Sequence, residues 1–292
     1  MKLCRHGEEE VLRLNQAVNP DGTVFPYLTF PNLEKTGMVR HLFTTRDGGV
    51  SEGMFRSLNL SFLRGDDEAA VHENYRRIAR VMESDEAHFV LTDQTHTTNV
   101  RCVTEEDAGK GLVRERDYQD VDGLVTNVPG LVLGAFFADC VPLFFVDPVH
   151  RAIGLSHSGW RGTVNRMGKA TVEKMTSLYG TDPGELICAI GPSICYDCYE
   201  VGDDVALQFR AAFPGHETEV LSPEVRDGRE VPGKSLLDLW RANRIVLEEA
   251  GVLPEHVALT DICTCENGDV LFSHRASSGK RGNLGAFMKL IG

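Results

Sequence analysis

Two segments of the chain, residues 66–83 and 163–179, show the periodicity of amphipathic helices. In each segment the mostly apolar residues of one face follow one another at steps of three and four. These residues are Val71, Tyr75, Ile78 and Met82 in the first segment and Val164, Met167, Thr171, Met175 and Leu178 in the second. Gly180 provides a stop signal for the second helix. Two shorter helices are expected over residues 202–213 and 235–250.

Short apolar runs rich in Val, Leu and Phe predict buried strands. They cover residues 88–92, 121–156, 185–190, 257–261, 270–273 and 286–291. The stretch 121–156 is expected to hold three strands, VDGLVT, LVLGAFF with its continuation through VPLFFV, and RAIGLS. Strands and helices interleave without strict alternation. The pattern therefore predicts an α+β fold, a single compact domain with mixed β-sheets flanked by helices.

The same pattern divides the chain into an extension and one domain. Residues 1–40 contain Pro20, Pro26 and Pro31 and are expected to form an irregular N-terminal extension. Residues 41–292 are expected to form a single catalytic domain. The stretch 214–234, rich in Pro, Gly and Glu, is interpreted as a surface excursion and not as a domain boundary.

Composition narrows the range of partners. The 292-residue chain carries 30 Lys and Arg against 43 Asp and Glu, a net charge of −13. Such a chain repels nucleic-acid polymers and anionic membrane surfaces, so small molecules are the expected partners. No run of about 18 apolar residues predicts a membrane helix, and the polar N-terminal sequence lacks a signal-peptide core, so we expect a cytoplasmic protein. The eight cysteines are expected to be reduced thiols or metal ligands.

Polar motifs follow three predicted strands, at positions where rigid scaffolds commonly carry functional groups. They contain His96, Cys140 and His157. Two imidazoles and a thiolate suit Zn²⁺, and three protein ligands leave a fourth position for water or substrate. The same atoms suit a second chemistry, because a neighbouring His makes Cys140 a nucleophile, with Asp139 or His96 as the orienting group. The residues leave both interpretations open.

Two further cysteine pairs, Cys195/Cys198 and Cys263/Cys265, have the CxxC and CxC spacings of metal sites. A four-thiolate zinc site would require the pairs to meet. Because they lie far apart in the sequence and no flanking signature links them, we interpret them as reduced side chains on separate turns. The ten His residues include no His-x-His pair, which argues against a copper oxidase with a trinuclear cluster.

A series of short motifs runs through most of the chain, from about Phe43 to the C-terminus. In order they are TRDGGVSEG, SLNL, GDD, QTH, DGLVT, ADCVP, HSGWRG, GPSI, YEVG, DLxxAN, CT and FSHR. In this order they resemble the bacterial laccase-domain proteins, also described as the polyphenol oxidase or peptidoglycan-editing-factor family and as purine nucleoside phosphorylases. Thr97 stands where the family pattern has Gly, and His274 stands where Tyr is commoner.

The resemblance implies a zinc site and a reaction. It implies that one zinc ion, or alternatively copper, is held by His96, Cys140 and His157. It also implies phosphorolysis of adenosine, inosine and methylthioadenosine, with deamination of adenosine as a side activity. Cys140 and His157 are then expected to be catalytic. Asp139 is expected to carry a proton or, alternatively, to orient a metal ligand.

Phosphate and nucleoside would need residues that hold them. We expect Arg46 and Arg161 to bind phosphate, since guanidinium groups bind phosphate bidentately, and Asn59 to contact the substrate. One alternative is a cysteine amidase or deamidase acting on a cell-wall precursor or peptide. Others are a copper phenol oxidase and a metal-bearing binding module without catalysis.

Overall fold

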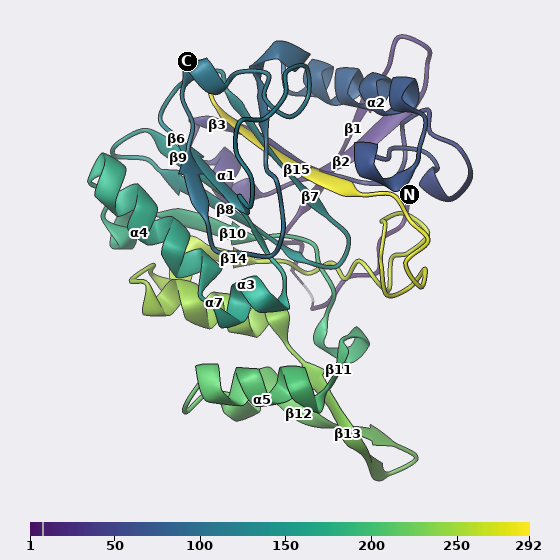
Figure 1. Ribbon diagram of the computed structural model, residues 1–292, viewed down its shortest axis with the longest axis vertical. Helices are drawn as coiled ribbons and strands as arrows, with labels where there is room; N and C mark the ends of the chain where they lie inside the picture. Colours follow the sequence, from purple (N-terminus) through teal and green to yellow (C-terminus); the bar gives the residue numbers. More distant parts are fainter. Residues whose placement is uncertain (8) are drawn as a thin grey trace.

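Two six-stranded β-sheets pack face to face around the main hydrophobic core (Figure 1). The computed structural model describes residues 1–7 and 9–292. Side chains from the two sheets meet in the core, where the ring of His41 lies 6.0 Å from that of Phe144. Towards one edge of this interface, Phe137 of the first sheet packs 5.5 Å from His157 of the second. The predicted α+β class with mixed sheets is confirmed.

The first sheet has the strand order β1-β2-β3-β15-β7-β4. Its neighbouring strands are antiparallel except for the parallel pair β4 and β7. The strands are β1 (Arg13–Val18), β2 (Val24–Thr29), β3 (Val39–Thr44), β4 (Phe89–Leu91), β7 (Val132–Phe137) and β15 (Leu284–Leu290). Because β15 lies between β3 and β7, the C-terminal end of the chain forms the middle of this sheet.

The second sheet has the order β14-β10-β8-β9-β6-β5, with parallel pairs at both edges. Its strands are β5 (Val100–Cys102), β6 (Gly123–Thr126), β8 (Val141–Asp147), β9 (Ala152–Ser158), β10 (Ile187–Ile190) and β14 (Val257–Leu259). Every residue of β8 and β9 is buried. A third, antiparallel sheet consists of β11 (Glu200–Gly202), β12 (Leu221–Arg226) and β13 (Arg229–Leu237).

Helices cover the outer faces of both large sheets. The helices are α1 (Pro31–Glu34), α2 (Glu68–Val81), α3 (Trp160–Val164), α4 (Met167–Tyr179), α5 (Asp203–Ala212), α6 (Glu217–Val220) and α7 (Leu239–Glu249). Helix α2 packs on the first sheet, with the Tyr75 ring 6.2 Å from that of Phe287. Helices α4 and α7 cover the second sheet, and α5 packs with the third sheet at one end of the molecule (Figure 1). Among the described residues, no helix combines the length and hydropathy that crossing a membrane requires.

The prediction of an irregular segment over residues 1–40 is wrong. This segment contains β1, β2 and α1, and it extends the first sheet. The three prolines occupy positions that tolerate them. Pro20 follows β1, Pro26 lies in β2 beyond its pairing with β3, and Pro31 begins α1.

Four other predictions need correction. The segment 163–179 forms two helices because Arg166 adopts a left-handed conformation (φ 65°) between α3 and α4. The stretch 121–156 contains four strands because the chain turns at Asp139 (φ 83°) between β7 and β8. Residues 270–273 are irregular rather than a strand, and Leu271 and Phe272 fill the core, so their apolar run reflects burial alone. Residues 235–237 end β13, so the predicted helix over 235–250 begins only at Leu239 as α7. The excursion 214–234 is built of α6 and the β12–β13 hairpin.

Candidate metal centre and active site

Three ligand-type side chains converge at the edge of the two large sheets. His96 lies in the loop after β4, Cys140 in the turn between β7 and β8, and His157 in β9. Their ligating atoms all lie within 4.8 Å of one another. The Sγ atom of Cys140 is 3.9 Å from Nε2 of His96, and the two imidazole rings are 5.0 Å apart. We call these three residues the metal triad.

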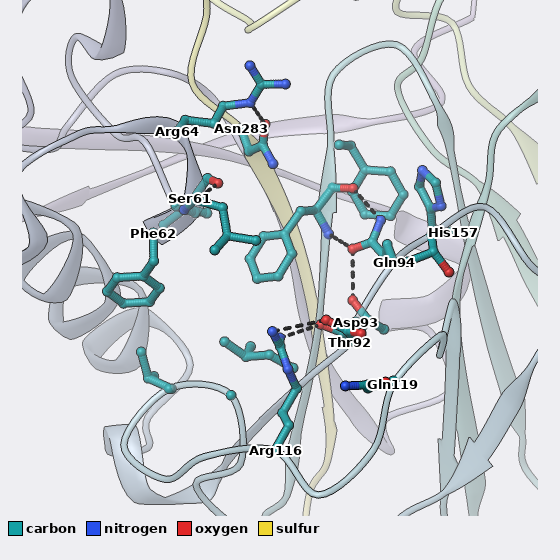
Figure 2. A pocket seen from close by; sticks show the side chains of 18 of the residues that line it. Ser61, Phe62, Arg64, Thr92, Asp93, Gln94, Arg116, Gln119, His157 and Asn283 are labelled. Atoms are coloured by element: carbon teal, nitrogen blue, oxygen red, sulfur yellow. Dashed lines mark hydrogen bonds and ion pairs between the residues drawn. The ribbon is translucent and has the colours of Figure 1, made fainter.

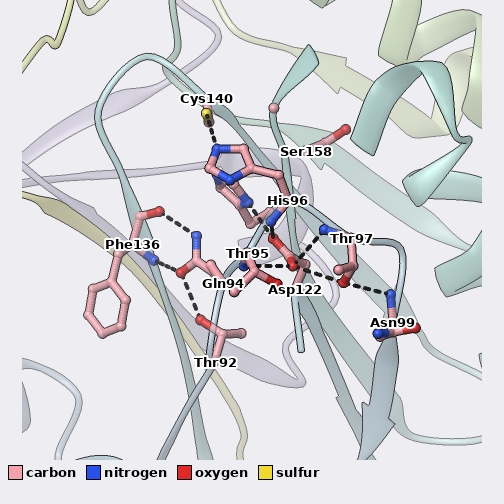
Figure 3. A network of polar contacts seen from close by, with 12 residues as sticks. Thr92, Gln94, Thr95, His96, Thr97, Asn99, Asp122, Phe136, Cys140 and Ser158 are labelled. Atoms are coloured by element: carbon pink, nitrogen blue, oxygen red, sulfur yellow. Dashed lines mark hydrogen bonds and ion pairs between the residues drawn. The ribbon is translucent and has the colours of Figure 1, made fainter. Parts of the chain in front are cut away.

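Asp122, at the start of the DGLVT motif, organises two members of the triad (Figure 3). Its buried carboxylate accepts a hydrogen bond from Nδ1 of His157 at 2.8 Å. It also accepts from the backbone N–H groups of residues 95, 96 and 97 at 2.9–3.1 Å. These contacts hold His96 in its left-handed conformation (φ 67°). Burial raises the pKa of Asp122, but these donors hold it below its usual value, so the carboxylate is charged.

The triad fits a metal ion. Because Nδ1 of His157 bonds Asp122, its Nε2 remains as the ligating atom, which is the common carboxylate–histidine–metal arrangement. Gly159 leaves the room that the triad needs. A Cβ atom at this position would lie 2.9 Å from Cδ2 of His96 and 3.0 Å from Sγ of Cys140. Two imidazoles and one thiolate form a three-ligand set of the catalytic kind.

Without a metal, the triad also forms a charged thiolate–imidazolium pair. Burial raises the pKa of Cys140, but the charge and hydrogen bond of His157, together with His96, lower it to about 6. Burial lowers the pKa of His157, whereas the Cys140 thiolate and Asp122 raise it to about 9. The same three side chains therefore suit metal binding and nucleophilic chemistry.

A large cavity opens beside the triad (Figure 2). Its volume is about 1170 Å³, and all three triad residues line it. One wall is formed around Gln94, which donates to the carbonyl of Phe136 at 2.8 Å and accepts from its N–H at 2.7 Å. Aromatic side chains of Phe62, Phe136 and Tyr118 also line the cavity. Such a pocket combines apolar surface with polar groups that orient a ligand.

Two arginines face each other in this cavity. Arg64 and Arg281 both line it, and both donate hydrogen bonds to the side-chain oxygen of Asn283. Nε of Arg281 is buried and, within residues 1–7 and 9–292, has no hydrogen-bond partner. Burial and the neighbouring Arg64 charge lower the pKa of Arg281 to about 10, so it stays charged at neutral pH. We call these two residues the Arg pair. Two neighbouring guanidinium groups that line the same cavity suit an anion.

The predicted substrate residues lie elsewhere, and none of the three lines this cavity in the described part of the chain. Arg46 donates to the carbonyls of Arg56 and Gly268 beside a smaller pocket. Arg161 is exposed and stacks on Trp160. Asn59 is fully buried and uses its amide to hold neighbouring backbone and side chains.

Asp139 supports the turn that presents Cys140. Its carboxylate accepts a hydrogen bond from the hydroxyl of Thr264 and one from the backbone N–H of Arg275, both at 2.7 Å. Its own carbonyl accepts from the N–H of Ile194 at 3.0 Å. With both carboxylate oxygens occupied, Asp139 is arranged to hold a turn in place.

The sequence interpretation assigned no role to three residues that the structure makes prominent: Asp122, Arg64 and Arg281. Asp122 belongs to a motif that was recognised, and a carboxylate is a frequent partner of a metal-ligating His. The Arg pair carries no comparable signal, because its members come from distant turns that meet only in the folded chain.

The interpretation of the two cysteine pairs as separate turns is wrong. The Sγ atoms of Cys195, Cys198 and Cys263 lie within 4.8 Å of one another. The thiol of Cys265 contacts that of Cys198. We call these four residues the cysteine cluster. The pairs meet because the bridge between Ser193 and Cys263 joins their loops in parallel beyond the ends of β10 and β14.

Comparison with known proteins identifies the family. Residues 40–291 match the family model described as multi-copper polyphenol oxidoreductase laccase. The chain belongs to this laccase family. The resemblance inferred from the sequence motifs is thereby confirmed.

Relatives of this laccase family member carry names from purine chemistry. A purine nucleoside phosphorylase of Deinococcus radiodurans is 40% identical over 265 residues, 91% of this chain and 93% of the relative. Purine nucleoside phosphorylase YlmD of Bacillus subtilis is 36% identical over 250 residues, 84% of this chain and 86% of the relative. Adenosine deaminase RL5 of an unknown prokaryotic organism is 35% identical over 235 residues, 80% of this chain and 87% of the relative.

The fold of this laccase family member is also found in solved structures. A crystal structure of the Bacillus licheniformis hypothetical protein YfiH matches with a TM-score of 0.84 at 32% identity. The match covers 90% of this chain and 96% of that chain.

Proposed function

We propose that this protein is a zinc-dependent purine nucleoside phosphorylase that acts on adenosine, inosine and methylthioadenosine and deaminates adenosine as a side activity. One observation carries the proposal: the metal triad and the Arg pair open into the same cavity. A phosphorylase needs an anion site close to the centre where the glycosidic bond breaks. The names of two relatives support phosphorolysis, and the name of a third supports adenosine deamination.

The Arg pair holds phosphate in this proposal. Two guanidinium groups offset the charge of the anion and aim one of its oxygens at the anomeric carbon of the ribose. As the new C–O bond forms, the glycosidic C–N bond breaks and its electron pair leaves with the purine, which takes up a proton. Arg64 and Arg281 replace Arg46 and Arg161 in this role because they line the cavity of the triad.

The triad holds the metal. His96 and Cys140 provide one ligand atom each, and His157 provides Nε2 while Asp122 holds its ring in place. A bound zinc ion would supply Lewis acidity next to the substrate. The cavity wall around Phe136 and Phe62 offers the apolar, aromatic surface on which a purine packs.

Asp139 serves as a positioning residue in this proposal. Its carboxylate is occupied by Thr264 and Arg275, which favours support of the Cys140 turn over proton transfer. The deaminase activity uses the same metal triad and cavity, but there water attacks C6 of the purine, the C6–N bond to the amino group breaks, and ammonia leaves. Adenosine and inosine would both enter the cavity, since they differ only in the group at C6.

The test is a nucleoside assay combined with metal analysis. Purified protein is incubated with inosine or adenosine, with and without phosphate, and the products are separated by chromatography. We expect free base and ribose 1-phosphate only when phosphate is present, and inosine from adenosine in both cases. Cys140→Ala should lose both activities and the triad metal. Phosphorolysis by a Cys140→Ala protein that lacks this metal would overturn the zinc mechanism.

A second function, a cysteine amidase or deamidase acting on a cell-wall precursor or peptide, is favoured by one observation. In the metal-free triad, His157 makes Cys140 a thiolate at neutral pH, as a cysteine nucleophile requires. This function predicts hydrolysis that resists chelators and is blocked by thiol alkylation. Zinc chemistry predicts the opposite response to chelators.

Copper is the alternative metal, since a His₂Cys set with an axial Met forms blue-copper sites. In the described part of the chain, however, no Met lines the cavity beside the triad. The donor set with an open position therefore favours zinc. Copper with a visible thiolate band in the purified protein would favour phenol oxidation instead.

A further inference from the structure

The cysteine cluster lies outside the cavity of the metal triad, and the proposed function does not use it. Cys195 and Cys263 are buried, with exposed fractions of 2% and 0%, and Cys198 and Cys265 are half-buried. Trp240 packs against them. All eight cysteines of the chain are free thiols in the structure. Three thiols within 4.8 Å of one another, with a fourth, Cys265, packed against them, call for an explanation beyond apolar packing.

We propose that the cysteine cluster binds a second metal ion as a closed, four-thiolate zinc site. Structural zinc is held by four ligands in a tetrahedron, and CxxC and CxC turns are common sources of such ligands. With a Zn–S distance of about 2.3 Å, tetrahedral sulfurs lie ~3.8 Å apart. The Sγ atoms of Cys195, Cys198 and Cys263 already lie within 4.8 Å of one another. Sγ of Cys265 lies outside this group but beside Cys198, and a shift of its side chain towards the other three would complete the coordination.

The backbone around the cluster is arranged for thiolates. The N–H of Cys195 donates to Sγ of Cys263 at 3.2 Å. N–H groups that point at a metal-bound sulfur stabilise its negative charge. Two loops supply the ligands, one after β10 and one after β14, and they are joined by the bridge between Ser193 and Cys263. The fold therefore brings the ligand pairs together before any metal binds.

A different set, His6, Cys195 and Glu266, also has ligand atoms within 4.8 Å of one another. It shares Cys195 with the cluster, so the two sets compete. His6 and Glu266 already pair with each other at 2.7 Å near the surface. A thiophilic ion favours sulfur, so the four-thiolate set holds the metal and the His6–Glu266 pair covers it.

The second site would support the first. Thr264, between the two ligands of the CxC turn, donates its hydroxyl to Asp139 at 2.7 Å. Ile194, next to Cys195, donates its N–H to the carbonyl of Asp139 at 3.0 Å. Asp139 directly precedes Cys140 in the chain. A metal in the cysteine cluster therefore fixes two loops that hold the turn carrying a triad ligand.

The experiment counts metal ions in protein purified without oxygen and under reducing conditions. We expect two zinc ions per chain in the wild type, one in Cys140→Ala and one in Cys198→Ser. Cys102→Ala removes a half-buried thiol outside both sites and should retain two. An unchanged metal content in Cys198→Ser would overturn the proposal. So would a wild-type protein with a single metal ion that is absent from Cys140→Ala.

Cobalt provides a readout that does not depend on variants of the cluster. Cys140→Ala keeps all four cluster thiols, so Co²⁺ added after its zinc has been removed under reducing conditions should give the intense thiolate-to-cobalt absorption of a four-sulfur site. Three results would each overturn a zinc site. They are the absence of this absorption, a thiol count in the unreduced protein that is two lower than expected, and the presence of iron with inorganic sulfide. None of these measurements uses nucleoside turnover, so they stand or fall separately from the proposed phosphorylase.

The fourth ligand is tested by a matched pair of variants. Cys265→Ser should lower the content to one ion per chain, and Glu266→Gln should leave two. The reverse result would replace Cys265 by Glu266 in the ligand set and overturn the four-thiolate assignment. Cys265→Ser also provides the test if Cys198→Ser fails to fold, which circular dichroism would reveal.

Discussion

The carboxylate of Asp122 accepts a hydrogen bond from Nδ1 of His157 at 2.8 Å, and the backbone of His157 in turn donates its N–H to the carbonyl of Asp122 at 2.8 Å. Asp122 directly precedes β6, and His157 lies in β9, which pairs with β6, so the sheet itself sets their spacing. The same carboxylate receives the N–H groups of residues 95–97. One buried charge therefore orients one imidazole of the triad and shapes the loop that carries the other.

Replacing Asp122 should weaken zinc binding without removing a ligand. In Asp122→Asn, an amide NH₂ group replaces one carboxylate oxygen and faces backbone N–H groups that need an acceptor. The substitution also weakens the contact that orients His157. We expect the zinc affinity of the triad to fall roughly 10- to 100-fold. Competition with a chromogenic chelator measures it.

Asp147→Asn is the matched control for this prediction. Asp147 is also fully buried and accepts from Nδ1 of a histidine, His150, at 3.0 Å, but it lies at the far end of β8. Asp147→Asn should reduce stability while zinc affinity stays at the wild-type value. Equal losses of affinity in both variants would show that Asp122 acts only through stability.

The Arg pair should control the use of phosphate. Arg281→Gln and Arg64→Gln each remove charged hydrogen bonds to the anion, which are worth about 1.5–3 kcal/mol. We therefore expect the KM for phosphate to rise roughly 10- to 100-fold, with a smaller change in the KM for nucleoside. Steady-state assays with phosphate as the varied substrate measure this split. Arg244→Gln, on the outer face of α7, should leave both constants unchanged.

Arg46→Gln tests the expectation from the sequence. If it raises the KM for phosphate and Arg281→Gln does not, the sequence assignment is right and the assignment from the cavity is wrong.

Metal-free protein should contain an unusually reactive thiol. His157 and His96 lower the pKa of Cys140 to about 6 against the opposing effect of burial. A thiol with a lowered pKa becomes a thiolate as the pH rises through that value, so alkylation of Cys140 should accelerate between pH 5 and 7. His157→Gln should move this rise to higher pH. Alkylation is followed by mass spectrometry, with Cys140→Ala as the blank for the other thiols. A rise centred near pH 9 in the wild type would contradict the charged pair.

His41 should make the protein sensitive to acid. Burial lowers its pKa from 6.5 to about 3, and its Nε2 accepts a hydrogen bond from the N–H of Phe30 at 2.8 Å. The native state holds this ring neutral, so the unfolded state binds more protons between about pH 3 and pH 6.5. Stability is therefore complete above the unfolded pKa and is lost as the pH falls. Between pH 7.5 and pH 5 the loss from this residue is about 2 kcal/mol.

Urea denaturation at several pH values checks this prediction with His41→Gln, which keeps an acceptor but does not titrate. The variant should lose about 2 kcal/mol less than the wild type over the same interval. Parallel curves for the two proteins would mean that His41 takes up its proton in the folded state as readily as in the unfolded state.

Local patterns predicted α2, β4 and β15 because each pattern reports burial on one face of one element. They failed at Asp139 and Arg166, where a left-handed residue divides an apolar run that periodicity joins. The three triad residues could be selected from the sequence since their residue types and motifs are characteristic of metal ligands. The sequence could not predict the Arg pair or the meeting of the two cysteine pairs. Both depend on loops that come together only when distant strands pair.

The final prediction concerns the space that Gly159 leaves in the triad. Gly159 has an extended backbone (φ −72°, ψ −178°) that any residue adopts, so Gly159→Ala introduces no backbone strain. Its new methyl group would lie 2.9 Å from Cδ2 of His96 and 3.0 Å from Sγ of Cys140, closer than van der Waals contact allows. We therefore expect the variant to fold, to lose the triad metal and to lose turnover.

Gly162→Ala is the matched control, since its methyl group would meet its nearest neighbour, Cβ of Met167, at 3.5 Å. Metal analysis and thermal unfolding of both variants distinguish a blocked site from a damaged fold. Full metal content in Gly159→Ala would show that the triad opens wider than the structure describes and that its metal does not sit between these three side chains.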